Sequence, residues 1–249
     1  SYIFSLYLNT IQRTRISTDQ DTSVILRCIH YGADYSSFCE LPKGQLFVSG
    51  GTRLIGFDIY LKSQTAFLID TVRDFAMSNK QDMLAPRKNH GSAYCAGFVY
   101  VAGGTSTERY VCSEDRWEML TGLPDKLQGT TVVALEAYQS VYTIGGKMPT
   151  YPLKTIFRTL ITGTEWVLMK VHLPFVATTR VPCFKVDSSK VYLIVEESLY
   201  TFDSRFIHLA RSNIGKIWCC NGPCFYENEV LFCTNPSGAT VRYKLGPLQ

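Results

Sequence analysis

The sequence predicts an all-β fold made of repeated antiparallel sheets with four strands each. Tyrosine (15) and phenylalanine (14) are both abundant among the 249 residues, and aromatic side chains favour strands over helices. A short apolar and aromatic pattern recurs five times along the chain. No long segment with the 3.6-residue period of a helix separates the repeats, which argues against alternating strands and helices.

Five segments carry the recurring pattern. Their central ring position is aromatic in four copies and leucine in the fifth: Phe47, Tyr100, Tyr142, Tyr192 and Leu231. The steps between these positions are 53, 42, 50 and 39 residues. Uneven steps suit repeats joined by loops of variable length, and their mean is close to the length of one β-propeller blade. The sequence therefore predicts a β-propeller.

Each repeat is predicted to contain four strands joined by short turns. The recurring segment is the second strand, and an apolar stretch and a polar turn precede it. The third and fourth strands of the first four repeats are predicted at residues 54–61 and 66–69, 109–112 and 117–120, 155–161 and 166–171, and 199–202 and 206–210. The fifth repeat ends near Leu245 without an evident fourth strand.

The N-terminal segment is predicted to close the ring. Residues 1–33 offer strand candidates and a linker, and residues 34–249 hold the blades of a single domain. A strand from the N-terminus that pairs with the last blade would remove two open sheet edges. Five blades are predicted, and a sixth blade assembled from both ends of the chain is the alternative.

The second repeat resembles the Kelch repeat. It combines Gly103-Gly104 at the end of the second strand with Tyr110 and, seven positions later, Trp117. The resemblance extends over residues 37–245 and is weaker in the last two repeats, which lack the glycine pair. The seven-residue spacing has fainter copies, namely Tyr60 with Phe67 and Tyr200 with Ile207. The resemblance implies a Kelch-type propeller, with the fold of the galactose-oxidase propeller.

Two physical expectations accompany the pattern. Glycine at the end of the second strand permits backbone angles and close contacts that a Cβ would forbid. Large rings fill the widening gap between neighbouring blades, so Trp117, Tyr110 and Trp166 are expected to be buried there.

Composition limits the function classes. The net charge is +4 and the basic residues are scattered, which argues against a nucleic-acid binder. No apolar run is long enough to span a bilayer, so no membrane contact is expected. Nine cysteines, an odd number, argue against a fully paired secreted scaffold and favour reduced thiols and a cytoplasmic location. The chain starts without Met, which favours a piece of a longer protein or complex.

No recognisable constellation for catalysis, metal or cofactor is present. The four histidines form none of the local zinc patterns, and the cysteines at 219, 220, 224 and 233 lack the spacing of paired zinc knuckles. Nucleophile elbows, phosphate-binding loops and dinucleotide fingerprints are missing from the sequence. We therefore expect a binding protein without enzymatic activity, cofactor or metal.

Binding is expected on one face of the propeller. Because strands alternate in direction, the loops between second and third strands share a face with the crossings between blades, and loops on a rigid scaffold concentrate binding residues. The predicted partner-binding residues on this face are Arg53, Arg87, Lys88, Lys147, Tyr151 and Arg180. Their positive charge favours an acidic or phosphorylated segment of a protein partner.

Three functions are compatible with these features. The first is a protein–protein interaction scaffold, such as a cytoskeletal or assembly component. The second is the substrate-receiving part of a ubiquitin-ligase adaptor, which needs a further domain outside these residues. The third is a sugar or small-molecule enzyme on the same fold, which a deep central pocket lined with charged residues would favour. The resemblance to Kelch proteins favours the scaffold.

Overall fold

The computed structural model has 24 strands and one short helix in the part of the chain that it describes. This part comprises residues 2–7, 10–15, 22–28, 35–56, 59–104, 106–124, 126–185, 187–205, 207–217, 225–227, 230–234 and 240–245. For β1–β3 and for parts of β6 and of β22–β24, only the backbone is described.

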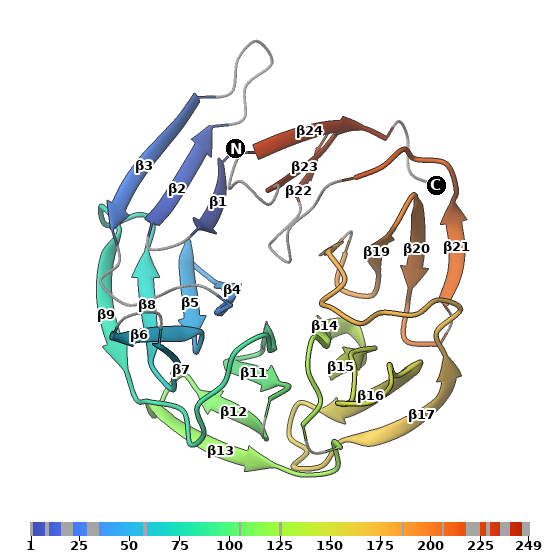
Figure 1. The fold of residues 1–249 in the computed structure, drawn as a ribbon, viewed down its shortest axis with the longest axis horizontal. Helices are drawn as coiled ribbons and strands as arrows, with labels where there is room; N and C mark the ends of the chain where they lie inside the picture. Colours follow the sequence, from blue (N-terminus) through green and yellow to red (C-terminus); the bar gives the residue numbers. More distant parts are fainter. Residues whose placement is uncertain are drawn as a thin grey trace.

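Four sheets have four strands each and are arranged as the blades of a β-propeller. Figure 1 shows them following one another around a common centre, with β4 and β14 near the centre and β9, β13, β17 and β21 at the rim. Neighbouring strands within every blade are antiparallel. The all-β class and the propeller arrangement are therefore confirmed.

In each blade the strands follow one another from the centre outwards in chain order. The first blade has β4 (Ser37–Leu41), β5 (Gln45–Ser49), β8 (Ala66–Asp70) and β9 (Ala76–Lys80). The second has β10 (Gly91–Cys95), β11 (Phe98–Ala102), β12 (Thr107–Val111) and β13 (Arg116–Leu120). The third has β14 (Thr131–Leu135), β15 (Ser140–Ile144), β16 (Thr155–Leu160) and β17 (Val167–His172), with the helix η1 (Glu136–Tyr138) between β14 and β15. The fourth has β18 (Cys183–Lys185), β19 (Val191–Val195), β20 (Ser198–Phe202) and β21 (Ile207–Arg211).

Two further sheets have three strands each. They are β1 (Tyr2–Tyr7), β2 (Thr10–Arg15) and β3 (Thr22–Cys28), and β22 (Phe225–Glu227), β23 (Val230–Thr234) and β24 (Thr240–Lys244). In Figure 1 both lie in the arc between the fourth blade and the first. Among the described strands, β1–β3 pair only with one another, so the N-terminal segment forms its own sheet instead of lending a strand to the last blade. The described residues thus contain four complete blades, fewer than the predicted five or six.

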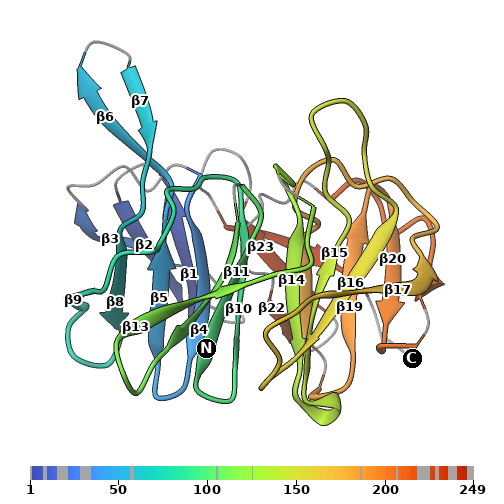
Figure 2. The same ribbon diagram turned by 90° about the horizontal axis from the view of Figure 1, so that it is seen from below.

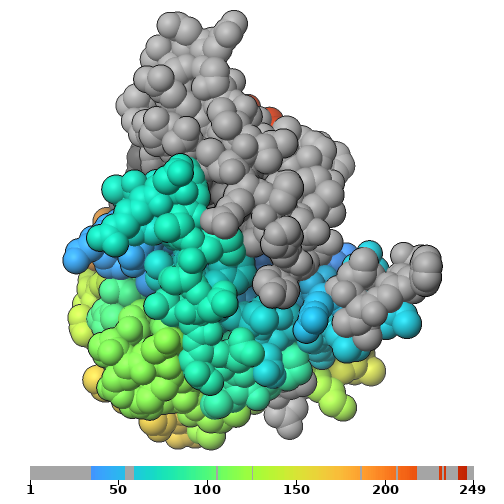
Figure 3. Space-filling view, turned by 90° about the vertical axis from the view of Figure 1, so that its left-hand side faces the viewer, coloured from blue at the N-terminus to red at the C-terminus, as the bar shows by residue number. Residues whose placement is uncertain are grey.

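The first blade contains an insertion that the sequence pattern did not predict. Residues 54–61 were expected to form its third strand, but β5 pairs directly with β8. The intervening chain forms a separate hairpin of β6 (Thr52–Gly56) and β7 (Ile59–Lys62). The hairpin projects beyond the blades in Figure 2, and its cyan residues extend from the right-hand side of the molecule in Figure 3. Tyr60 is therefore not the counterpart of Tyr110, which lies on a third strand.

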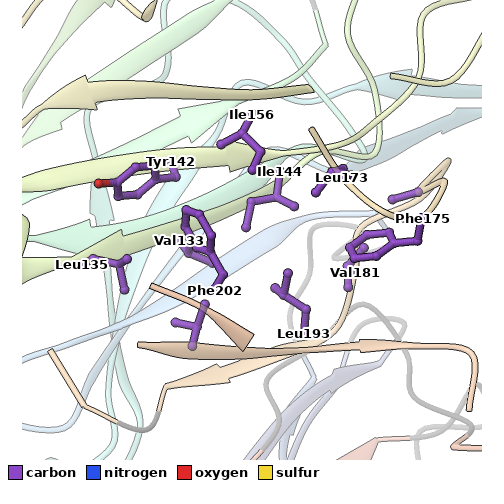
Figure 4. Packing of buried hydrophobic residues seen from close by; sticks show 12 residues of the cluster. Val133, Leu135, Tyr142, Ile144, Ile156, Leu173, Phe175, Val181, Leu193 and Phe202 are labelled. Carbon is purple, nitrogen blue, oxygen red and sulfur yellow. The ribbon is translucent and has the colours of Figure 1, made fainter. Parts of the chain in front are cut away.

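The hydrophobic core fills the spaces between blades, as the sequence predicted. Trp117 and Tyr110 pack against Phe47 of the first blade, with ring centroids 6.0 and 4.8 Å away. Trp166 lies in a cluster with Ala93 and Tyr100 of the second blade. All three predicted aromatic residues are buried. Figure 4 shows the corresponding layer between the third and fourth blades, where the rings of Tyr142 and Phe202 meet edge to face at 5.0 Å.

The glycine pairs have the role that the sequence indicated. Both members of each pair, at 50–51, 103–104 and 145–146, have positive φ. A Cβ on Gly50 would lie 2.6 Å from the carbonyl oxygen of Arg87, in the segment that crosses to the next blade. Glycine therefore allows the end of the second strand to touch this crossing segment, which holds neighbouring blades together.

Candidate functional site

One face of the propeller gathers the connections that vary most between blades. They are the crossing segments 81–90, 121–124 with 126–130, and 173–182, and the links from second to third strands at 50–56 with 59–65, 103–104 with 106, 145–154 and 196–197. We call this side the loop face. It is the upper side in Figure 2, where the β6–β7 hairpin and the 145–154 loop are two separate projections.

Arg87 does not belong to an exposed binding surface, contrary to the prediction. Its side chain is 0% exposed and forms an ion pair with Glu108, which was expected in a loop and is also fully buried. Arg87 also donates to the carbonyl of Gly103 at 3.2 Å, and Glu108 accepts the backbone N–H of Leu84 at 2.7 Å and of Ala85 at 3.1 Å. Burial lowers the pKa of Arg87, although Glu108 opposes the shift. The pair therefore fixes the 81–90 crossing to the second blade.

Arg180 lies where the innermost strands of three blades begin. It precedes β18, and its Nη1 donates at 3.2 Å both to Oγ of Ser37, the first residue of β4, and to the carbonyl of His90, which directly precedes β10. Its Nε is buried without a hydrogen-bond acceptor. Burial lowers the pKa of Arg180 to about 10, so the guanidinium stays charged at neutral pH.

The groups around Arg180 are neutral. The Oγ atoms of Ser37 and Ser92 are 2.8 Å apart, and Nε2 of the buried His90 lies 3.0 Å from Oγ of Ser49. Burial holds the pKa of His90 well below its ordinary value, and the charges of Arg87 and Arg180 add to this effect. We call Ser37, Ser49, His90, Ser92 and Arg180 the central polar cluster. These five described residues together carry one net positive charge, and they lie at the loop-face end of the propeller axis.

The pKa of His90 leads to a prediction about stability and pH. Because the folded-state pKa lies below the ordinary value of 6.5, the unfolded chain takes up this proton first as the pH falls. The contribution of neutral His90 to stability is therefore retained above pH 6.5 and lost below it. We expect the stability of the wild type, measured by urea unfolding between about pH 8 and pH 5.5, to fall more steeply than that of His90→Gln. Parallel pH profiles of the two proteins would contradict this assignment, and His172→Gln, at an exposed position, is the control.

The remaining predicted residues lie on the loop face without converging. Arg53 is exposed on β6, whereas Lys147 and Tyr151 are exposed on the 145–154 loop of the third blade. Lys88 is half-buried, with its ammonium 5.7 Å from the ring centroid of Tyr35. The structure thus brings only Arg180 to the centre. The sequence did not predict that His90 and the three serines would lie beside Arg180, and their positions at the ends of inner and second strands were the available signal.

A pocket of about 250 Å³ opens between the second blade and the segment that crosses to the third. Gly104 and Ser106 line one side, and Leu123 and Leu127 line the other. Ser106 also holds Arg87, since its Oγ accepts from Nη2 at 2.8 Å. The pocket is therefore next to the structural ion pair and offers a mixed apolar and polar surface to a side chain.

The described residues contain no group of three His, Cys, Asp or Glu side chains placed to hold a metal ion. None of the helices in the described part of the chain is long and apolar enough to cross a membrane. In comparisons with known proteins, no protein-family model matches the chain, and no curated protein matches it either. The arrangement of the described sheets defines the protein as a β-propeller.

Proposed function

We propose that this propeller is a protein-interaction scaffold whose loop face holds an acidic segment of a partner. The observation that carries the proposal is the β6–β7 hairpin. Ile59, Tyr60 and Leu61 are each more than half exposed, although they alternate between the two faces of the hairpin. An isolated two-stranded ribbon is marginally stable in water, and clustered exposed apolar side chains mark interaction sites.

Charge on the loop face supports an acidic partner. The Arg87–Glu108 pair is neutral overall, and its charges are buried. The exposed or half-buried cations in the described loop-face segments are Arg53, Lys62, Lys88, Lys126, Lys147, Lys154 and Arg180. The acidic side chains in the same segments are Asp82, Glu196 and Glu197. The positive excess favours negatively charged partners by attracting them during encounter.

We also propose a type and a number for the blades. Kelch-type blades are supported by the glycine pairs with positive φ and by the contact between Tyr110 and Trp117, whose ring centroids are 5.1 Å apart. We further propose that the two three-stranded sheets are the fifth and sixth blades of one ring. A cytoplasmic location fits the free cysteines at 39, 95, 112 and 183, and burial raises the pKa of Cys39 to about 12, which keeps its thiol unreactive. The role of a ubiquitin-ligase receptor and that of an enzyme stay predictions from the sequence.

The test is selection of binding peptides from a displayed library of random sequences. We expect the wild type to enrich sequences rich in Asp and Glu, and the triple variant Ile59→Ser, Tyr60→Ser and Leu61→Ser to bind them at least about tenfold more weakly, because the apolar contact is lost. Leu160→Ser is the matched control, since Leu160 is also exposed but lies at the opposite end of its blade. Enrichment without acidic residues, or equal binding by the triple variant, would refute the proposal.

A further inference from the structure

The central polar cluster contains an arginine, Arg180, whose charge has no counter-charge among the described residues. The two buried arginines among the described residues are each paired, Arg87 with Glu108 and Arg109 with Glu118. Arg180 is half-buried as a residue, and its Nε atom is buried. Arg180, by contrast, forms no salt bridge with any described carboxylate, and its two hydrogen bonds go to a serine hydroxyl and a backbone carbonyl. A partly desolvated charge without a counter-charge lowers stability, so an arginine at this position favours a role outside folding.

The guanidinium has unused donors. Nη1 donates to Oγ of Ser37 and to the carbonyl of His90. Within the described part of the chain, Nε is buried without an acceptor and Nη2 has no hydrogen-bond partner. A planar guanidinium with free N–H groups is suited to a carboxylate, whose two oxygens accept hydrogen bonds in the same plane.

The surroundings determine which anion the site fits. His90 adds no charge, because its pKa is depressed, and the nearby hydroxyls of Ser37 and Ser92 are neutral donors. One unpaired positive charge is neutralised by one carboxylate, whereas a phosphate dianion would leave excess negative charge in a partly desolvated site. Arg180 is half-buried at the loop-face end of the axis, so a partner segment that lies across this face can contact it.

We infer that the central polar cluster binds a single carboxylate group, the side chain of Asp or Glu in a partner segment, with Arg180 as its counter-charge. The inference rests on the proposed interaction function and adds to it one specific contact at the axis. The β6–β7 hairpin then contributes apolar contacts, and the exposed lysines of the loop face raise the rate of encounter with the partner. Arg180 selects for the acidic residue that binds at the centre.

The experiment measures binding of fluorescein-labelled hexaglutamate by fluorescence anisotropy, with hexaserine as the neutral probe. We expect the wild type to bind hexaglutamate and not hexaserine, and Arg180→Gln to bind it at least about tenfold more weakly. Lys43→Gln removes an exposed charge in the turn between β4 and β5, at the opposite end of the first blade, and is the matched control, expected to change affinity less than about threefold. Equal affinity of Arg180→Gln and the wild type, or no hexaglutamate binding by the wild type, overturns the inference.

Two further readouts separate this site from a structural role and from other anions. Arg180→Gln is expected to melt at or above the wild-type temperature, since an unpaired charge is removed; a clear decrease would assign Arg180 a structural role. Acetate is expected to compete with hexaglutamate better than inorganic phosphate at equal charge concentration, and the reverse order would overturn the carboxylate assignment. The ¹⁵Nε–H signal of Arg180 in the wild type is expected to shift on adding hexaglutamate, which tests the site without any substitution.

The outcomes also distinguish this inference from the proposed function. Loss of binding by Arg180→Gln with full binding by the hairpin triple variant would support the central site and refute the role of the hairpin. Loss of binding by the triple variant alone would support the hairpin and refute the central site.

Discussion

Replacing Arg87 with Met is expected to lower the free energy of unfolding by about 3–5 kcal/mol, enough to leave little folded protein. The variant would leave the carboxylate of Glu108 without its ion-pair partner at a position with no solvent exposure. Two backbone N–H groups, of Leu84 and Ala85, would still bind that carboxylate, but its counter-charge would be gone. Equilibrium unfolding in urea followed by far-UV circular dichroism measures the loss.

Two comparisons make this result specific. Arg116→Met removes an arginine that pairs with Glu114 and Glu118 at the surface, and such exposed pairs contribute little to stability because solvent screens them. The double variant Arg87→Met with Glu108→Gln removes both charges and is expected to recover part of the stability. Wild-type stability of Arg87→Met would show that the buried pair is not what fixes the crossing segment. A charge reversal at Arg87 is consequently unsuitable as a test of binding, although the sequence pattern placed it on the binding face.

Replacing Trp117 with Ala is expected to cost about 3–5 kcal/mol. The indole is 7% exposed, packs against the rings of Phe47 and Tyr110, and donates from Nε1 to the carbonyl of Gln81 at 2.7 Å. The substitution would leave a cavity between the first two blades, where the strands cannot close up because the next blade fixes their position.

The control for this prediction is Trp117→Phe, which keeps an aromatic ring in the gap and loses the hydrogen bond to Gln81. It should cost less than the alanine variant, because the loss of a single hydrogen bond contributes about 1 kcal/mol. Thermal melts of both variants by circular dichroism give the order. A melting temperature of Trp117→Ala equal to the wild-type value would mean that this ring does not join the blades.

The blades were predictable from sequence because their signals are local. A strand such as Phe98–Ala102, its following glycine pair and the aromatic residues of the next two strands lie within about 20 residues, and each has a physical reason to recur in every blade. The hairpin insertion was missed for the opposite reason. Residues 54–61 are as apolar and aromatic as a true third strand, and only the pairing of β5 with β8 across the insertion shows the difference.

The candidate site depended on contacts that no local pattern encodes. The burial of Arg87 follows from Glu108, 21 positions later, and the placement of Arg180 follows from Ser37, 143 positions earlier. Sequence reasoning could place both arginines on crossing segments of one face. It could not tell that Arg87 points into the protein and pairs with Glu108, whereas Arg180 lies at the axis without a counter-charge among the described residues.

The attachment of the β6–β7 hairpin has a consequence for how this propeller tolerates change in length. Its two ends are tied together at the blade, since Ser63 N–H donates to the carbonyl of Gly51 at 2.9 Å and Gly51 N–H donates to that of Arg87 at 2.9 Å. The chain between those ties closes a loop whose entropy depends only weakly on the number of residues in it, about 0.6 kcal/mol for each doubling. Foreign segments or an affinity tag could therefore be spliced in between β6 and β7 at small cost, while β5 and β8 stay paired beneath them.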